Sequence, residues 1–221
     1  MSASGLPKMK LWYYPLYRST RCMWLIKELG IEESVEYAYL DMTNRPKQPP
    51  EREEYRKKVH PHATIPALEM EGHPPILESG AICLYLADLC GRFVPEPKDR
   101  ADYYNWIMYS SCTMDTVMER LTDQWWLVKP EEQDKEVVAK ARADSELCLD
   151  HAERALEGKD FILGKELTAA DCVLSYNIIW ANMREMNNGV LLEGRPNLKA
   201  YLARISARPA LKETLAVGQG K

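Results

Sequence analysis

The stretch HPHATIPALE, residues 60–69, places Pro66 where a strand should begin, directly after Ile65. Proline has no backbone N–H and fits poorly inside a sheet. A cis peptide bond before proline costs only about 0.5–1 kcal/mol and usually marks a tight turn. We therefore expect a cis Ile65–Pro66 bond that leaves the N–H and C=O of Ile65 unpaired. Those two groups could bind an extended peptide laid alongside as an added strand.

A second pair of polar residues, Glu78 and Ser79, stands where the next helical pattern begins. A helix N-terminus has unpaired N–H groups and a partial positive charge, so it attracts carboxylates. Ser79 can add a hydroxyl, and Glu78 can accept a hydrogen bond from an ammonium group. Together with Ile65, this pair predicts a site for a short acidic peptide.

Other kinds of site chemistry have less support. His60 and His62 flank Pro61 with no acidic partner at metal-ligand spacing, so we expect no metal. The chain has no phosphate-binding loop, HExxH or GxSxG motif. Its six cysteines form no CxxC pair, and we expect them to be reduced and mostly buried, as in a cytosolic protein.

The elements that position these residues follow from hydrophobic periodicity. The first ninety residues read as β-α-β-(α)-β-β-α, with strands at 9–14, 35–42, 65–70 and 71–77 and main helices at 21–30 and from Ser79. The stretch GRFVPEPKDR then interrupts the pattern with one glycine and two prolines. Beyond it only helices are predicted, near 99–125, 131–157, 169–186 and 197–206. We expect an α/β domain at 8–90, a linker at 91–98 and an all-α domain at 99–215.

Composition narrows the class of protein. The 221 residues carry a formal net charge of −4, with 46% hydrophobic and 28% charged residues. This balance argues against a nucleic-acid or anionic-membrane binder, which would show a basic excess. No apolar run approaches the roughly 20 residues of a membrane helix, and the N-terminus lacks the apolar stretch of a signal peptide. We expect a cytoplasmic protein.

The whole chain resembles the cytosolic glutathione transferases. Three stretches carry the resemblance: ATIPALEMEGHPPILESGAICLYLADL, FILGKELTAADCVLSYNIIWANM and RPNLKAYLARISARPALKE. The resemblance implies a thioredoxin-like N-terminal domain followed by an all-helical C-terminal domain, with glutathione as co-substrate and a homodimer as the usual assembly. It also implies conjugation of glutathione to small hydrophobic electrophiles, with peroxidase side activity possible. The alternative is a non-catalytic ligand carrier or interaction module on the same fold.

The resemblance also assigns the glutathione-binding residues. Ile65, followed by Pro66, resembles the residue whose backbone pairs with the cysteinyl part of glutathione. Glu78 and Ser79 resemble the pair that holds the γ-glutamyl end. Thr64 stands where many members have Lys or Gln. Three residues lie in the segment that often contacts the glycyl carboxylate, and all three stay candidates: Lys47, Gln48 and Arg52.

The family chemistry needs a hydroxyl that stabilises the glutathione thiolate near the start of the first helix. Serine-type members have Ser where this chain has Tyr17, which we favour as the donor. Tyrosine-type members use a Tyr closer to Tyr13 or Tyr14, and Ser19 is a further choice. No cysteine falls at the donor position, because Cys22 lies about a turn into the helix. Thiol-transfer chemistry is therefore disfavoured.

Two further expectations concern the helical domain. In the family the first C-terminal helices line the pocket for the electrophile, and we expect Trp106, Met114 and Met118 to do so here. Other aromatic residues crowd the same region: Tyr103, Trp125 and Trp126. The stretch TAAD at 168–171 fits an N-terminal capping box, which predicts a structural role for Asp171.

Overall fold

Contacts divide the chain into two units. One unit combines the residues up to Arg92 with those from Arg208 onward, and the other spans Phe93–Ala207. The computed structural model describes residues 5–43, 50–183 and 190–217. The expected helical domain at 99–215 thus includes a last helix, α10 (Pro209–Ala216), whose contacts group it with the first unit. The exact domain boundaries stay a prediction.

The first unit is built on a four-stranded mixed sheet in the order β2-β1-β3-β4. β1 (Met9–Tyr13) runs parallel to β2 (Val35–Tyr39) and antiparallel to β3 (Ala67–Met70). β3 in turn pairs antiparallel with β4 (His73–Ile76). This sheet with its flanking helices confirms the thioredoxin-like fold predicted for the N-terminal half.

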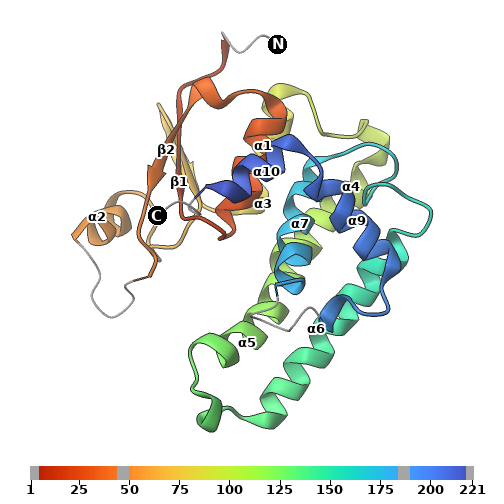
Figure 1. The fold of residues 1–221 in the computed structure, drawn as a ribbon. Coiled ribbons are helices and arrows are strands. Elements are labelled where there is room, and N and C mark those ends of the chain that lie inside the picture. Colours follow the sequence, from red (N-terminus) through yellow and green to blue (C-terminus); the bar gives the residue numbers. More distant parts are fainter. Residues whose placement is uncertain (1–4, 44–49, 184–189, 218–221) are drawn as a thin grey trace. The chain divides into compact units, whose positions relative to one another are not determined.

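Successive side chains of β1 point to opposite faces of the sheet, so this strand can contact helices on both faces. Figure 1 shows α1 (Ser19–Leu29), α3 (Ser79–Cys90) and α10 together beside the sheet, with α2 (Pro50–Lys58) apart from them. Leu11 of β1 is fully buried. The next residue, Trp12, contacts Tyr55 of α2, with ring centroids 4.8 Å apart. The site residues lie on this α2 side.

The first helix has the apolar stripe that its sequence predicts. Cys22, Leu25 and Ile26 are fully buried and Leu29 is nearly so. The helix ends at Gly30, whose φ of 69° is left-handed and whose N–H is directed at the carbonyls of Ile26 and Lys27. Glycine adopts this conformation without the steric cost of a side chain, so the predicted stop is confirmed.

Charged side chains attach α10 to α1 within the first unit. Arg208 Nη2 donates to Glu28 Oε2 at 2.6 Å, and Trp24 Nε1 donates to Glu28 Oε1 at 2.8 Å. Burial alone would raise the pKa of Glu28, but the hydrogen bonds from Arg208 and Trp24 lower it below its usual value. Because these donors stabilise the carboxylate form, Glu28 acts as an ionised anchor for the last helix.

The second unit is helical, as predicted. α4 (Arg100–Met108) continues through a π-helical turn (Tyr109–Met114) into α5 (Asp115–Trp126). The other helices are α6 (Lys135–Ala155), α7 (Ala169–Ala181) and α9 (Pro196–Ser206). Three 3-10 turns of this unit lie at Pro97–Asp99, Pro130–Glu132 and Val190–Leu192, and one more lies in the first unit at Glu32–Ser34. Among the described residues, none of the helices has the length and apolarity that a membrane span requires.

The N-terminus of α7 is organised by the buried carboxylate of Asp171. Its oxygens accept hydrogen bonds from the backbone N–H groups of Ile162 and Thr168, at 2.8 and 2.9 Å. The hydroxyls of Thr168 and Tyr201 donate to it as well, at 3.0 and 3.3 Å. Burial raises the pKa of Asp171 to about 6, although these donors oppose the rise. The predicted capping box is present.

Replacing this carboxylate should destabilise the fold. Asp171→Ala leaves buried N–H groups of Ile162 and Thr168 without their acceptor, so we expect the free energy of unfolding to fall by roughly 3 kcal/mol. For a chain of this size that corresponds to a melting temperature about 6–12 °C lower. Thermal unfolding followed by circular dichroism measures it. Glu166→Ala, at an exposed position just before the helix, is the control that should melt like the wild type. An Asp171→Ala protein with unchanged unfolding would contradict the structural role.

Candidate functional site

The tyrosines after β1 and the backbone of Ile65 lie in one cluster on the α2 side of the sheet. Its buried members are Leu40, Met42, Tyr55, Ala63, Ile65 and Ala67. Five partly buried side chains pack against them: Trp12, Tyr14, Tyr17, Val59 and Leu77. The structure therefore brings two candidate hydroxyl donors together with the candidate peptide-binding residue, from segments about fifty positions apart in the sequence.

The turn before β3 is fixed by side chains from α2. The Ile65–Pro66 peptide bond is cis, as predicted. The Tyr55 hydroxyl donates to the carbonyl of Thr64 at 2.7 Å, and Arg52 Nη2 donates to the carbonyl of Ala63 at 3.4 Å. Neither backbone group of Ile65 has a hydrogen bond to another described residue. Its neighbours hold the turn while Ile65 itself stays unpaired.

Arg52 is a buried cation with donors to spare. Its side chain is only 7% exposed, and Nε and Nη1 have no hydrogen-bond partner among the described residues. An arginine cannot lose its proton in a protein, so a buried guanidinium needs acceptors. Arg52 therefore provides a ready contact for an anion. The other two candidates for the glycyl carboxylate, Lys47 and Gln48, lie outside the described residues.

At the start of α3, Ser79 accepts hydrogen bonds from two residues of α1. Arg21, which is fully buried, donates from Nη1 to Ser79 Oγ at 3.1 Å, and the Cys22 thiol donates to the Ser79 carbonyl at 3.8 Å. Because the hydroxyl oxygen accepts from Arg21, its own proton can be donated elsewhere. Glu78, the exposed N-cap residue, makes no side-chain cap hydrogen bond. The first N–H groups of α3 thus have no side-chain cap.

Arg21 is the site residue that sequence reasoning missed. It stands one turn before Leu25 and two turns before Leu29, on the apolar stripe of α1. A charged residue on a buried stripe is rare unless it is paired. That exception to the apolar pattern was the signal that could have identified it.

The three candidate thiolate donors differ in how their hydroxyls are used. The Ser19 hydroxyl is fully buried and donates to the carbonyl of Tyr14 at 2.8 Å. The Tyr14 hydroxyl is hydrogen-bonded to Tyr39. The Tyr17 hydroxyl, in contrast, has no hydrogen-bond partner in the part of the chain that the structure describes. Tyr17 also lies two residues before the first residue of α1, and its ring meets that of Tyr14 edge-on at 4.9 Å.

Electrostatics keep the Tyr14–Tyr39 pair protonated. Burial, followed by the nearby phenols of Tyr39 and Tyr17 and the carboxylate of Asp41, raises the pKa of Tyr14. Burial and Asp41 likewise raise the pKa of Tyr39. Both phenols therefore remain neutral at neutral pH, and either can act as a hydrogen-bond donor but not as a base.

The residues expected to line an electrophile pocket belong to the second unit. Trp106 is 6% exposed, stacks on His151 with ring centroids 5.0 Å apart, and meets Tyr109 edge-on. Met114 and Met118 are almost fully buried. Their role in substrate binding stays a prediction, and the side chains of Trp125 and Trp126 lie outside the described part.

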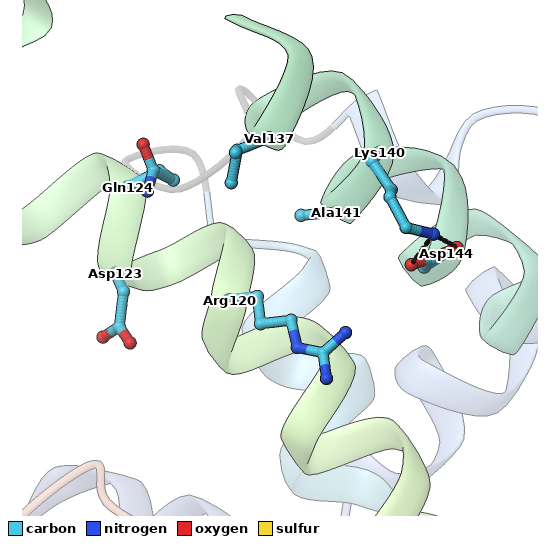
Figure 2. A pocket seen from close by; sticks show the side chains of 7 residues that line it. All are labelled: Arg120, Asp123, Gln124, Val137, Lys140, Ala141 and Asp144. Carbon is cyan, nitrogen blue, oxygen red and sulfur yellow. Dashed lines mark hydrogen bonds and ion pairs between the residues drawn. The ribbon is translucent and has the colours of Figure 1, made fainter. Parts of the chain in front are cut away.

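A separate cavity of about 300 Å³ lies between α5 and α6. It is lined by Arg120, Asp123, Gln124, Val137, Lys140, Ala141 and Asp144. Figure 2 shows charged side chains of both signs around it, with Lys140 and Asp144 already paired at 3.1 Å. None of the predicted site residues lines this cavity, so it does not contribute to the candidate site.

A metal site needs several ligating side chains, such as those of His, Cys, Asp and Glu, around one position. In the described residues, no group of three or more His, Cys, Asp or Glu side chains is placed to hold a metal ion. Both nitrogens of His60 have partners within the chain: the backbone N–H of His62 and the Thr64 hydroxyl.

Comparison with known proteins gives the family. Residues 7–88 match the model of the glutathione S-transferase N-terminal domain, and residues 115–209 match that of the C-terminal domain. Glutathione S-transferase GstA of Escherichia coli O157:H7 is 28% identical over 159 residues, which cover 72% of this chain and 75% of that protein. Glutathione transferase GST 23 of Zea mays is 25% identical over 97% of this chain and 91% of that protein.

Solved structures agree on the fold. A glutathione transferase from Burkholderia graminis, with two glutathione molecules bound per subunit, superposes with a TM-score of 0.84 at 24% identity. The match covers 97% of this chain and 90% of that one. With both domain models matched in order and relatives along almost its whole length, the chain belongs to the glutathione S-transferase family.

Proposed function

We propose that this protein is an enzyme that binds glutathione in the first unit and transfers its thiolate to small hydrophobic electrophiles. One observation carries the proposal. The unpaired backbone of Ile65 lies in a turn held by Arg52 and Tyr55, while Ser79 begins the helix that follows the β3–β4 pair. An extended peptide with an anionic group at each end matches such a set of donors.

The γ-glutamyl end is proposed to bind at α3. The Ser79 hydroxyl and the first N–H groups of the helix would hold its α-carboxylate, and Glu78 would accept from its ammonium group. The cysteinyl part would pair with the Ile65 backbone. Arg52 would hold the glycyl carboxylate, because its buried guanidinium retains two donors.

Tyr17 is the proposed thiolate donor. A free thiol has a pKa of about 8.5, so only a small fraction is ionised at neutral pH. A hydroxyl that donates to sulfur favours the anion, and the nearby N-terminus of α1 adds a favourable partial charge. Support for Tyr17 comes from elimination, because the hydroxyls of Ser19 and Tyr14 already have partners.

The reaction then needs little more than alignment. The thiolate attacks the electrophilic carbon, a C–S bond forms, and either the leaving group departs with its electron pair or an addition product is protonated. The protein contributes by raising the thiolate fraction and holding the sulfur close to the bound electrophile. We propose peroxide reduction as a side activity of the same site: the thiolate attacks one peroxide oxygen, the O–O bond breaks to release an alcohol or water, and a second glutathione converts the resulting sulfenic acid to glutathione disulfide.

A non-catalytic ligand carrier is the second candidate function. It is favoured by the tyrosine at position 17, where serine-type relatives have the donor. A carrier would bind glutathione or hydrophobic ligands without forming a thiolate. For either function we propose a cytoplasmic location and a homodimer. Gel filtration with light scattering would test the homodimer.

The thiolate itself provides the test of catalysis. Bound glutathione should show an ultraviolet thiolate band at neutral pH in a difference spectrum, and Tyr17→Phe should remove it. Losing one hydrogen bond to a charged group costs roughly 1.5–3 kcal/mol, so the pKa of the bound thiol should rise by about one to two units. The titration of the band with pH measures this shift.

Two matched variants complete that experiment. Tyr14→Phe should keep the band, because its hydroxyl is directed at Tyr39, and Ser19→Ala should keep it as well. If Tyr14→Phe alone abolishes the band, Tyr14 and not Tyr17 is the donor. Glutathione binding without any thiolate band in the wild type would favour the carrier.

The Arg21–Ser79 contact predicts a second effect, on affinity. Ser79→Ala should weaken glutathione binding roughly 10- to 100-fold, the range for losing a hydrogen bond to a charged group. Arg21→Met should weaken it less, since the hydroxyl remains but is no longer oriented. Isothermal titration calorimetry gives both dissociation constants, with Lys27→Met in the same helix as control. Equal affinity in wild type and Ser79→Ala would argue against γ-glutamyl binding at α3.

A further inference from the structure

The two ring nitrogens of His60 have different partners, and one of these partners favours the tautomer with the proton on Nε2. The ring is almost buried, 5% exposed, and the backbone N–H of His62 donates to Nδ1 at 3.2 Å. A nitrogen that accepts a hydrogen bond carries no proton, so in the neutral ring the proton is on Nε2. Nε2 lies 2.9 Å from Thr64 Oγ1. In this tautomer His60 is the donor in that contact and Thr64 the acceptor.

The surroundings of His60 favour this neutral form. Burial lowers the pKa of His60, and the neighbouring His62 lowers it further. The carboxylate of Glu78 and the carbonyl of Leu77 oppose the change without reversing it. The ring also stacks on Tyr55 of α2 at 6.3 Å. It is thus held in place by packing as well as by its two hydrogen bonds.

This arrangement leaves the proton of the Thr64 hydroxyl available for a hydrogen bond to another acceptor. A threonine hydroxyl has a single proton to donate. Since Oγ1 accepts from His60, that proton is directed away from the imidazole. The backbone of Thr64 is fixed separately, because its carbonyl accepts from Tyr55 at 2.7 Å. Thr64 itself is exposed, so an outside acceptor can reach the hydroxyl.

Thr64 and Arg52 border the same short segment. Arg52 contacts the carbonyl of Ala63, the residue before Thr64, and has two buried donors without partners among the described residues. A cation and a hydroxyl therefore belong to, or contact, two consecutive residues of this segment. A carboxylate, which only accepts hydrogen bonds, complements both.

We propose that His60 is a positioning residue, which turns the Thr64 hydroxyl toward the C-terminal carboxylate of glutathione and thereby selects ligands that carry this carboxylate. The inference rests on the proposed function. With the γ-glutamyl end at Ser79 and the cysteinyl part on Ile65, the glycine extends toward Thr64 and Arg52.

The test compares glutathione with γ-glutamylcysteine, which lacks the glycine, by isothermal titration calorimetry. Thr64→Val keeps the shape and removes the hydroxyl, and should weaken glutathione binding roughly 10-fold or more. His60→Phe keeps the ring and removes the donor, and should weaken it roughly 3- to 10-fold. Binding of γ-glutamylcysteine should be unchanged in both. Turnover should show a higher KM for glutathione at an unchanged kcat.

Conservative replacements sharpen the comparison. His60→Gln, whose amide nitrogen can take the place of Nε2, and Thr64→Ser should both restore affinity. The double variant His60→Phe/Thr64→Val should bind no more weakly than Thr64→Val, since His60 acts only through the hydroxyl. His73→Phe, at an exposed position in β4, should bind like the wild type.

Three outcomes separate the possible failures. A wild type that binds neither ligand overturns the proposed function and this inference with it. A wild type that binds both, with variants that lose affinity for both equally or for neither, overturns the inference alone. If His60→Phe does not fold, the pair Thr64→Val and Thr64→Ser decides, because a solvent-exposed side chain should tolerate both changes.

Discussion

The candidate site depends on one constraint: the backbone of Ile65 must stay unpaired in the turn that leads into β3, an interior strand of the sheet. Unpaired backbone groups are costly when buried, so the turn needs support from elsewhere. Tyr55 and Arg52 of α2 supply it by binding the carbonyls of Thr64 and Ala63. Trp12 of β1 packs against Tyr55 in turn. The apolar core on this side of the sheet therefore stabilises the turn at Ala63–Ile65, to which a peptide could bind as an added strand.

Two hydroxyls of the candidate site, those of Ser79 and Thr64, are each hydrogen-bonded to a buried nitrogen. Ser79 accepts from the buried guanidinium of Arg21, and Thr64 accepts from the buried imidazole of His60. The guanidinium of Arg21 can only donate, and His60 donates when its proton is on Nε2, so in both pairs the hydroxyl proton is left for a ligand. A free serine or threonine hydroxyl would rotate among several acceptors, and that freedom would be lost on binding. Orienting it beforehand reduces this entropic cost and favours anionic ligands at both ends of the site.

Much of this arrangement was predictable from local sequence patterns. The stripe of Cys22, Leu25 and Leu29 predicts α1, Gly30 predicts its end, and Ile65–Pro66 predicts the turn. Arg21 was missed because helical periodicity identifies apolar positions and gives no partner for a charge among them. His60 was considered only as a metal ligand, since its hydrogen bonds depend on how the chain folds back at Thr64. The last helix was missed as an element because Pro209 interrupts the pattern, and its contact with Glu28 joins residues 180 positions apart.

Binding and catalysis place different demands on this site. The proposed peptide binding would use backbone groups, a helix N-terminus and buried cations, none of which depends on the identity of residue 17. Thiolate formation depends on one hydroxyl that is not already used. Ser19 is committed to the Tyr14 carbonyl and Tyr14 to Tyr39. The ring of Tyr17 meets that of Tyr14 edge-on and packs against the cluster that contains Ile65. The proposal of catalysis thus depends on the single side chain of Tyr17, whereas the proposal of glutathione binding is supported by several independent contacts.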